Sequence, residues 1–87
     1  LIVPKVHLYQ MRIIDNIEHP TLRISIFEMN QKYIVKFELG ALEQSFKFSE
    51  LDIINLEILK ADVAEKIIPN VLLRFEEMQK DLKNCLG

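Results

Sequence analysis

The chain of 87 residues is poor in the residue types that build specialised sites. It contains no tryptophan, one cysteine (Cys85) and two glycines (Gly40 and Gly87). A single cysteine cannot form an internal disulfide, and two distant glycines cannot form a phosphate-binding loop. The low cysteine content is typical of a reducing compartment, so the chain is expected to be cytoplasmic.

Long hydrophobic runs are also missing. No apolar run approaches the roughly 20 residues that a membrane-spanning helix needs. Residues 1–5 lack the basic start, the sustained apolar stretch and the small-residue cleavage site of a secretion signal. We therefore expect no membrane partner. Residues 1–10 are either an extension of the domain or an edge strand.

Neither sign of charge dominates, which argues against nucleic-acid binding. Eleven Lys and Arg stand against 13 Asp and Glu, for a net charge of −2. The predicted order of three strands and a helix is similar to that of the double-stranded RNA-binding domain, a family that places a lysine cluster at the start of its C-terminal helix. The corresponding residues 62–66 carry one lysine and two acids. No nucleic-acid partner is expected.

What the chain has in abundance is apolar residues. Hydrophobic residues make up 49% of the sequence, at the upper edge of ordinary globular usage. A chain of this length fits one domain with one core, so residues 1–87 are predicted to form a single α+β domain. Much apolar material on a small body favours self-association.

Residues 21–39 alternate between apolar and polar side chains, as two half-buried strands do. A two-residue turn at Asn30 and Gln31 would place Ile26 opposite Val35 and Ile24 opposite Phe37. The same register places Arg23 opposite Glu38 and Leu22 opposite Leu39. Gln is a poor second residue for a type I′ turn, so a longer loop is the alternative.

A third strand is predicted to follow a turn at Gly40 and Ala41, where glycine can supply the positive φ of a type II′ turn. Two-residue closure pairs Val35 with Phe46 and Tyr33 with Phe48. A four-residue loop over 40–43 would instead pair Phe37 with Phe46. Either way the same face turns inward, and its members are Leu22, Ile24, Ile26, Tyr33, Val35, Phe37, Leu39, Leu42, Phe46 and Phe48.

A C-terminal amphipathic helix is predicted to cover this face. Residues 62–65 read as a capping box with Asp62 as the N-cap, and Pro69 indicates that the helix is kinked or starts there, without a change in the phase of its apolar residues. The predicted apolar stripe consists of Ala64, Ile67, Ile68, Val71, Phe75, Met78 and Leu82. Residues 50–61 fit a loop, a helical turn or a short strand.

The N-terminal stretch from Val6 to Ile14 is rich in β-formers and is predicted to be a fourth strand. Asp15-Asn16 and His19-Pro20 would then mark the connection to the next strand. The fold class is therefore α+β, with an antiparallel meander of three or four strands packed against the C-terminal helix.

No catalytic constellation emerges from the residue pattern. His7 and His19 have no metal-ligand spacing to another histidine or to Cys85, and they are interpreted as structural. Acidic residues of the predicted helix are interpreted as solvated surface. We expect no enzyme activity, no cofactor and no bound metal.

Protein binding is the favoured function, and a homodimer is the favoured form. The sheet face turned away from the helix, called the second face below, would carry Phe27, Met29 and Ile34, unless the N-terminal segment folds over them. Leu72 and Leu73 widen the apolar stripe and suit contact between helices, while pairing between sheet edges is another route to a dimer. The candidate partner interface therefore consists of Phe27, Met29, Ile34, Leu72 and Leu73. The alternative is a small-ligand carrier or minor enzyme with a pocket between helix and sheet near Tyr9, Tyr33 and Gln44.

Overall fold

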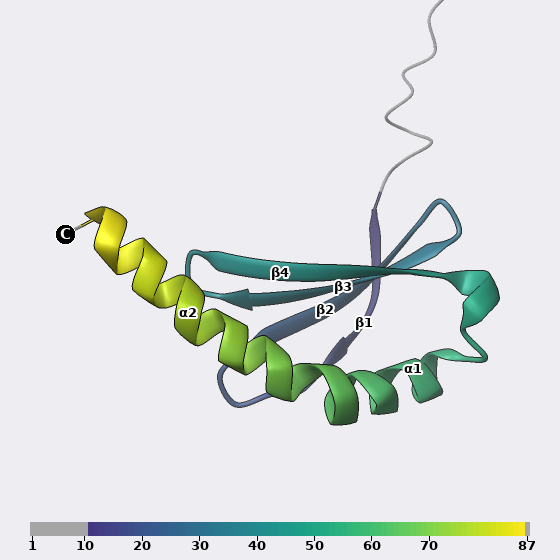
Figure 1. Ribbon diagram of the computed structural model, residues 1–87. Helices are drawn as coiled ribbons and strands as arrows, with labels where there is room; N and C mark the ends of the chain where they lie inside the picture. Colours follow the sequence, from purple (N-terminus) through teal and green to yellow (C-terminus); the bar gives the residue numbers. More distant parts are fainter. Residues whose placement is uncertain (1–10, 87) are drawn as a thin grey trace, which may run out of the picture.

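The computed structural model describes residues 11–86, which form a four-stranded antiparallel sheet followed by a long helical segment (Figure 1). The strand order is β1-β2-β3-β4. The elements in chain order are β1 (Arg12–Ile17), β2 (Arg23–Met29), β3 (Lys32–Leu39), β4 (Leu42–Ser49), the 3-10 turn η2 (Glu50–Asp52), α1 (Leu56–Asp62), the π-helical turn η3 (Val63–Ile67) and α2 (Ile68–Leu86). The predicted α+β meander with a C-terminal helix is confirmed.

The first predicted hairpin, β2–β3, has the predicted register. Ile26 pairs with Val35, and Arg23 pairs with Glu38. Asn30 and Gln31 form the two-residue turn with φ of 54° and 62°. Both values are left-handed, as a type I′ turn requires, although glutamine adopts them less readily than glycine.

The second hairpin, β3–β4, closes through Gly40 and Ala41 in two residues, and Gly40 takes a φ of 58°. Phe37 therefore pairs with Gln44, which excludes the four-residue loop. The rings of Phe37 and Phe46 still meet edge to face, with centroids 6.0 Å apart. Such aromatic contacts add to the stability of the covered face.

The fourth strand, β1, lies further along the chain than predicted. Asp15 and Asn16 belong to β1 and not to the connection, so that part of the prediction is wrong; residues 6–10 of the predicted strand lie outside the described residues. A bulge between Ile13 and Asp15 shifts the pairing with β2 by one residue. The connection runs through His19, whose Nδ1 accepts hydrogen bonds from the backbone amides of residues 21 and 22. This histidine is structural, as predicted.

The core lies between the sheet and the helical segment. All ten residues predicted to face inward are either buried there or packed against the buried cluster. The fully buried side chains come from both layers; they are Phe37, Phe75, Ile24, Ile26, Val35, Val63 and Val71. One face of the sheet is thus covered, as the alternation predicts.

The helical segment starts earlier than predicted. Its N-cap is Asn55, whose side chain accepts a hydrogen bond from the amide of Ile58 at 2.9 Å. Asp62 has helical φ and ψ and makes no capping hydrogen bond, so the predicted capping box is wrong. Two turns of helix already precede Asp62 in α1, so the amide groups after it are not the free ones that a cap would satisfy.

Pro69 disturbs the helix through a π-helical turn. Pro69 has no amide hydrogen to donate. In the turn that precedes it, the amide of Ile68 donates to the carbonyl of Val63, five residues back, which is the hydrogen bond of a π-helix. The turn inserts one residue, so Val63 and Ile68 share the buried face and Ala64 is exposed. The predictions that Ala64 belongs to the apolar stripe, and that Pro69 leaves the phase unchanged, are therefore wrong.

Candidate functional site

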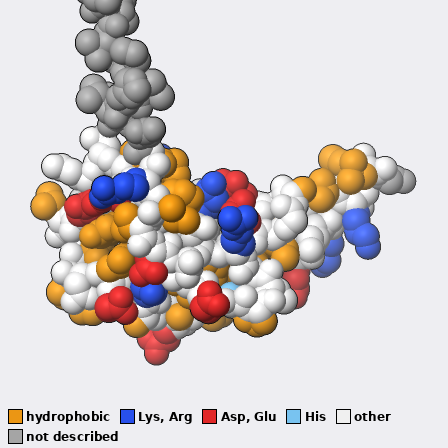
Figure 2. Space-filling view, turned by 180° about the vertical axis from the view of Figure 1, so that it is seen from behind, with side chains coloured by type: hydrophobic (Ala, Val, Ile, Leu, Met, Phe, Trp, Pro, Cys, Tyr) orange, Lys and Arg blue, Asp and Glu red, His pale blue; other side chains and the backbone are white. Residues whose placement is uncertain are grey.

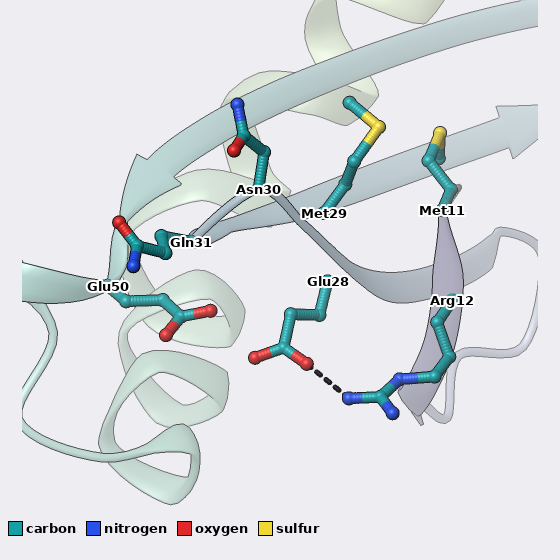
Figure 3. Close-up of a pocket in the computed structure, with 7 residues that line it drawn as sticks. All are labelled: Met11, Arg12, Glu28, Met29, Asn30, Gln31 and Glu50. Carbon is teal, nitrogen blue, oxygen red and sulfur yellow. Dashed lines mark hydrogen bonds and ion pairs between the residues drawn. The ribbon is translucent and has the colours of Figure 1, made fainter. Parts of the chain in front are cut away.

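A surface depression of about 670 Å³ lies beside the β2–β3 turn. Figure 3 shows the carboxyl groups of Glu28 and Glu50 pointing into the same space, and Arg12 approaching Glu28 from β1. The complete lining is Met11, Arg12, Glu28, Met29, Asn30, Gln31 and Glu50. The sequence gives little sign of this site, because its acidic residues are 22 positions apart and meet only when the meander folds.

The two carboxyl groups affect each other's protonation. Glu50 Oε2 is buried and has no hydrogen-bond partner among the described residues. The adjacent Glu28 carboxyl raises the pKa of Glu50. Hydrogen bonds from Glu50 and from Arg12 lower the pKa of Glu28. Glu50 therefore holds its proton to a higher pH than an isolated glutamate does, and Glu28 loses its proton at a lower pH.

This carboxyl pair links the end of β2 to η2 and makes their contact sensitive to pH. Among residues 11–86, no three His, Cys, Asp or Glu side chains come together in the way that a metal ion requires. The backbone amide of Glu50 also donates to the carbonyl of Gln31, at 3.1 Å. The cluster therefore fixes the chain where it leaves the sheet.

A second candidate site consists of two adjoining apolar depressions between β4 and α2, which share Met78 and are together called the groove below. Gln44 lies at one end of the groove, where its Nε2 donates to the carbonyl of Val71 at 3.0 Å and its Oε1 accepts from Arg74 at 2.8 Å. The Arg74 guanidinium lies 5.8 Å from the centroid of the Phe46 ring. The remaining lining residues are Leu42, Leu73, Glu77, Met78, Asp81, Leu82 and Cys85.

The C-terminal turns of α2 extend past the sheet beside the β3–β4 turn (Figure 1). Leu86, which is 80% exposed, lies on this projecting part, where Figure 2 shows a separate group of hydrophobic side chains. The length of α2 is the feature from which this overhang could have been predicted. The 19 residues of α2 span about 28 Å, whereas four strands are only about 15 Å across.

The second face of the sheet offers less apolar surface than its sequence suggests. Ile34 is only 5% exposed, and Phe27 and Met29 are half-buried. The ammonium group of Lys36 lies 5.2 Å from the centroid of the Phe27 ring. Ile13 of β1, paired with Phe27, is the more exposed apolar residue, at 57%. Hydrophobic and charged side chains alternate over the body of the molecule (Figure 2).

The five residues of the candidate partner interface do not form one surface. Phe27, Met29 and Ile34 belong to strands, whereas Leu72 and Leu73 belong to α2, which covers the opposite face of the sheet. Leu73, 60% exposed, lines the groove between β4 and α2.

Comparison with known proteins adds no relative. No protein-family model, curated protein or solved structure matches the chain. Among the described residues, no helix is long and apolar enough to cross a membrane.

Proposed function

We propose that this protein is a non-enzymatic, cytoplasmic protein-interaction module that self-associates. The observation that carries the proposal is the free outer edge of β4, which lies beside the apolar groove under the projecting turns of α2. No strand of residues 11–86 pairs with this edge. An open strand edge next to apolar surface is a common place for a second chain to bind.

The two edge strands, β1 and β4, differ in regularity, and this difference favours β4 as the strand that pairs with a second chain. The pairing of β1 is interrupted by a bulge, a feature that protects strand edges from pairing with other chains. In contrast, β4 pairs with β3 without interruption along all eight residues and contains no proline. Its regular outer edge is therefore ready to accept another strand.

Exposed apolar residues near β4 support the same function. Leu82, Leu86 and Leu73 are exposed on α2, and Leu51, in the turn η2 that follows β4, is 96% exposed. Single exposed leucines are ordinary on protein surfaces. Leu73 and Leu82 line the groove beside Gln44 and Leu42 of β4, so a partner seated there would remove both from water together.

The ligand-carrier alternative loses the observation that motivated it. It depended on Gln44 as a polar side chain without a partner in the covered face, whereas both ends of the Gln44 amide are hydrogen-bonded to α2. Tyr9 lies outside the described residues.

Sedimentation equilibrium of the full 87-residue chain, from micromolar to millimolar concentration, tests the proposal. We expect the average mass to rise from 10.2 kDa towards twice that value as concentration increases. Addition of dithiothreitol should not change the result, because a non-covalent dimer does not need Cys85. A constant monomer mass at 1 mM would refute self-association.

A further inference from the structure

The backbone groups of β4 alternate between the sheet and the free edge. Glu50 N donates to Gln31 O, which continues the pairing in which even-numbered residues of β4 point their amide and carbonyl groups at β3. The odd-numbered residues, Glu43, Ser45, Lys47 and Ser49, therefore point theirs outward. A second β4 strand added antiparallel must form its hydrogen bonds with these four residues.

We propose that two copies of this chain pair antiparallel through β4, with Ser45 on the two-fold axis and Glu43 of each copy opposite Lys47 of the other. This inference rests on the proposed self-association and specifies its surface and register. A two-fold interface repeats every contact, so one register creates two Glu43–Lys47 pairs. Opposite charges directly across paired strands stabilise a sheet.

The neighbouring registers are less favourable. A shift by two residues places Glu43 opposite Ser45 or Ser49, and both ion pairs are lost. A shift by four residues places Glu43 opposite Glu43, or Lys47 opposite Lys47, which is repulsive. The register centred on Ser45 pairs residues 42–48 of the two copies, which is nearly the whole of β4. The register centred on Phe46 overlaps equally well, so charge selects between the two.

Among the described residues of the monomer, the side chains of Glu43 and Lys47 have no oppositely charged partner. Within the sheet, Glu43 is paired with Glu38, another acid, and Lys47 is paired with Ile34. Lys47 of a second copy would place a positive charge beside the two glutamates and offset their repulsion.

The covered side of the sheet gains from the same register. Leu42 of one copy lies opposite Phe48 of the other, and both are only half-buried in the monomer. The overhanging turns of α2 run beside Leu42, as the groove lining shows. In the dimer they extend over the second copy near its Phe48, so Leu82 and Leu86 find apolar neighbours there.

Charge exchange tests the register. Glu43→Lys and Lys47→Glu each replace two attractive pairs by two repulsive ones, and each variant alone should weaken the dimer about tenfold or more. An equimolar mixture of the two variants restores both attractive pairs, so it should form a heterodimer with nearly wild-type affinity. Glu76→Lys, on the exposed surface of α2, is the matched control and should leave the affinity unchanged. Circular dichroism checks that each variant is folded.

Disulfide trapping tests the axis. In a Cys85→Ser background, Ser45→Cys places two thiols on the axis, where paired Cα atoms lie about 5.5 Å apart, within the range for a disulfide. Mild oxidation should convert most of the protein to a covalent dimer. Lys36→Cys, one strand inward on the same face, should stay monomeric under denaturing conditions, because about three strand spacings would separate its thiols.

The outcomes separate this inference from the proposed function. A wild-type chain that dimerises while the charge variants bind normally and Ser45→Cys fails to crosslink would overturn β4 pairing and leave self-association intact. Crosslinking of Lys36→Cys in place of Ser45→Cys would indicate packing through the second face and would also overturn it. A monomeric wild-type chain at 1 mM would refute both proposals.

Discussion

Lys60 Nζ lies 3.0 Å from Asp15 Oδ2, and this ion pair joins α1 to the edge strand β1 across 45 positions of the chain. Asp15 follows the bulge in β1 and pairs with Ile26, whose side chain is on the covered face. The bulge therefore positions an acidic side chain of the edge strand towards the helical layer. The ion pair closes the margin of the core on the side opposite β4.

The ion pair should make the stability depend on pH. The hydrogen bond from Lys60 lowers the pKa of Asp15 below its ordinary 3.8, and the bond to Asp15 raises the pKa of Lys60 above 10.5. The stabilisation is therefore present between these two values, and it is lost as the pH falls through the folded pKa of Asp15. We expect Asp15→Asn to lower Tm by a few degrees at pH 7 and to match the wild type near pH 2. Asp62→Asn, which removes the more exposed pair with Lys66, is the control and should have a smaller effect.

The raised pKa of Glu50 beside Glu28 predicts the opposite pH dependence. Because the folded pKa of Glu50 is raised, its contribution is present at pH values below its ordinary 4.5 and is lost as the pH rises through the folded value. Glu50→Gln stays neutral, and its amide can donate to Glu28 at any pH. The variant should melt at a higher temperature than the wild type at pH 8 and at a similar temperature at pH 4. An equal shift at both pH values would contradict a raised pKa of Glu50.

The π-helical turn predicts a sharp contrast between adjacent residues. Val63→Ala removes two buried methyl groups and should cost about 2 kcal/mol of unfolding free energy. Ala64→Ser changes an exposed position and should stay within about 0.5 kcal/mol. Urea titration of both variants measures the difference. A larger loss for Ala64→Ser would mean that the helix has the unshifted phase predicted from sequence.

The turn between β2 and β3 offers a stabilising substitution. Gln31 has a φ of 62°, which glycine adopts without steric cost. Gln31→Gly creates the Asn-Gly pair that type I′ turns prefer and should stabilise the fold by about 0.5 to 1 kcal/mol. Gly40→Ala is the converse change at φ 58°, where the space for a methyl group is open, and it should destabilise by a similar amount. Thermal melts of the two variants should shift in opposite directions.

The sequence predicts the sheet well because several local signals agree. Side-chain alternation, the turn residues Asn30 and Gly40, and the match of Arg23 with Glu38 all agree with the observed register, although the sequence also allows longer loops at both turns. A slip by one residue would expose the whole apolar face, so the register is strongly specified. For β1, residues 15 and 16 are turn formers in isolation, but pairing with β2 and the contact with Lys60 keep them in a strand.

The sequence predicts the helical segment less well because its phase depends on packing. The buried residues Val63 and Ile68 are five positions apart, a step that belongs to neither helix nor strand periodicity. Only a π-helical turn next to Pro69 makes both residues face the sheet. The carboxyl pair of Glu28 and Glu50 is similarly invisible in the sequence, since the two residues meet only after three strands are in place.

The sequence by itself determined the three strands of the meander and the face that is buried, because these follow from local periodicity and from turn geometry. The bounds of β1 and the two-residue closure of the second hairpin came from the tertiary structure. Only the tertiary structure decided which edge strand of the sheet is regular and where α2 runs past it. Those features depend on the bulge that interrupts β1, on the helix length relative to the sheet width, and on the shift that Pro69 imposes. The proposed β4 interface depends on these three-dimensional relationships. Its central residues, Glu43, Ser45 and Lys47, therefore look like ordinary strand surface in the sequence.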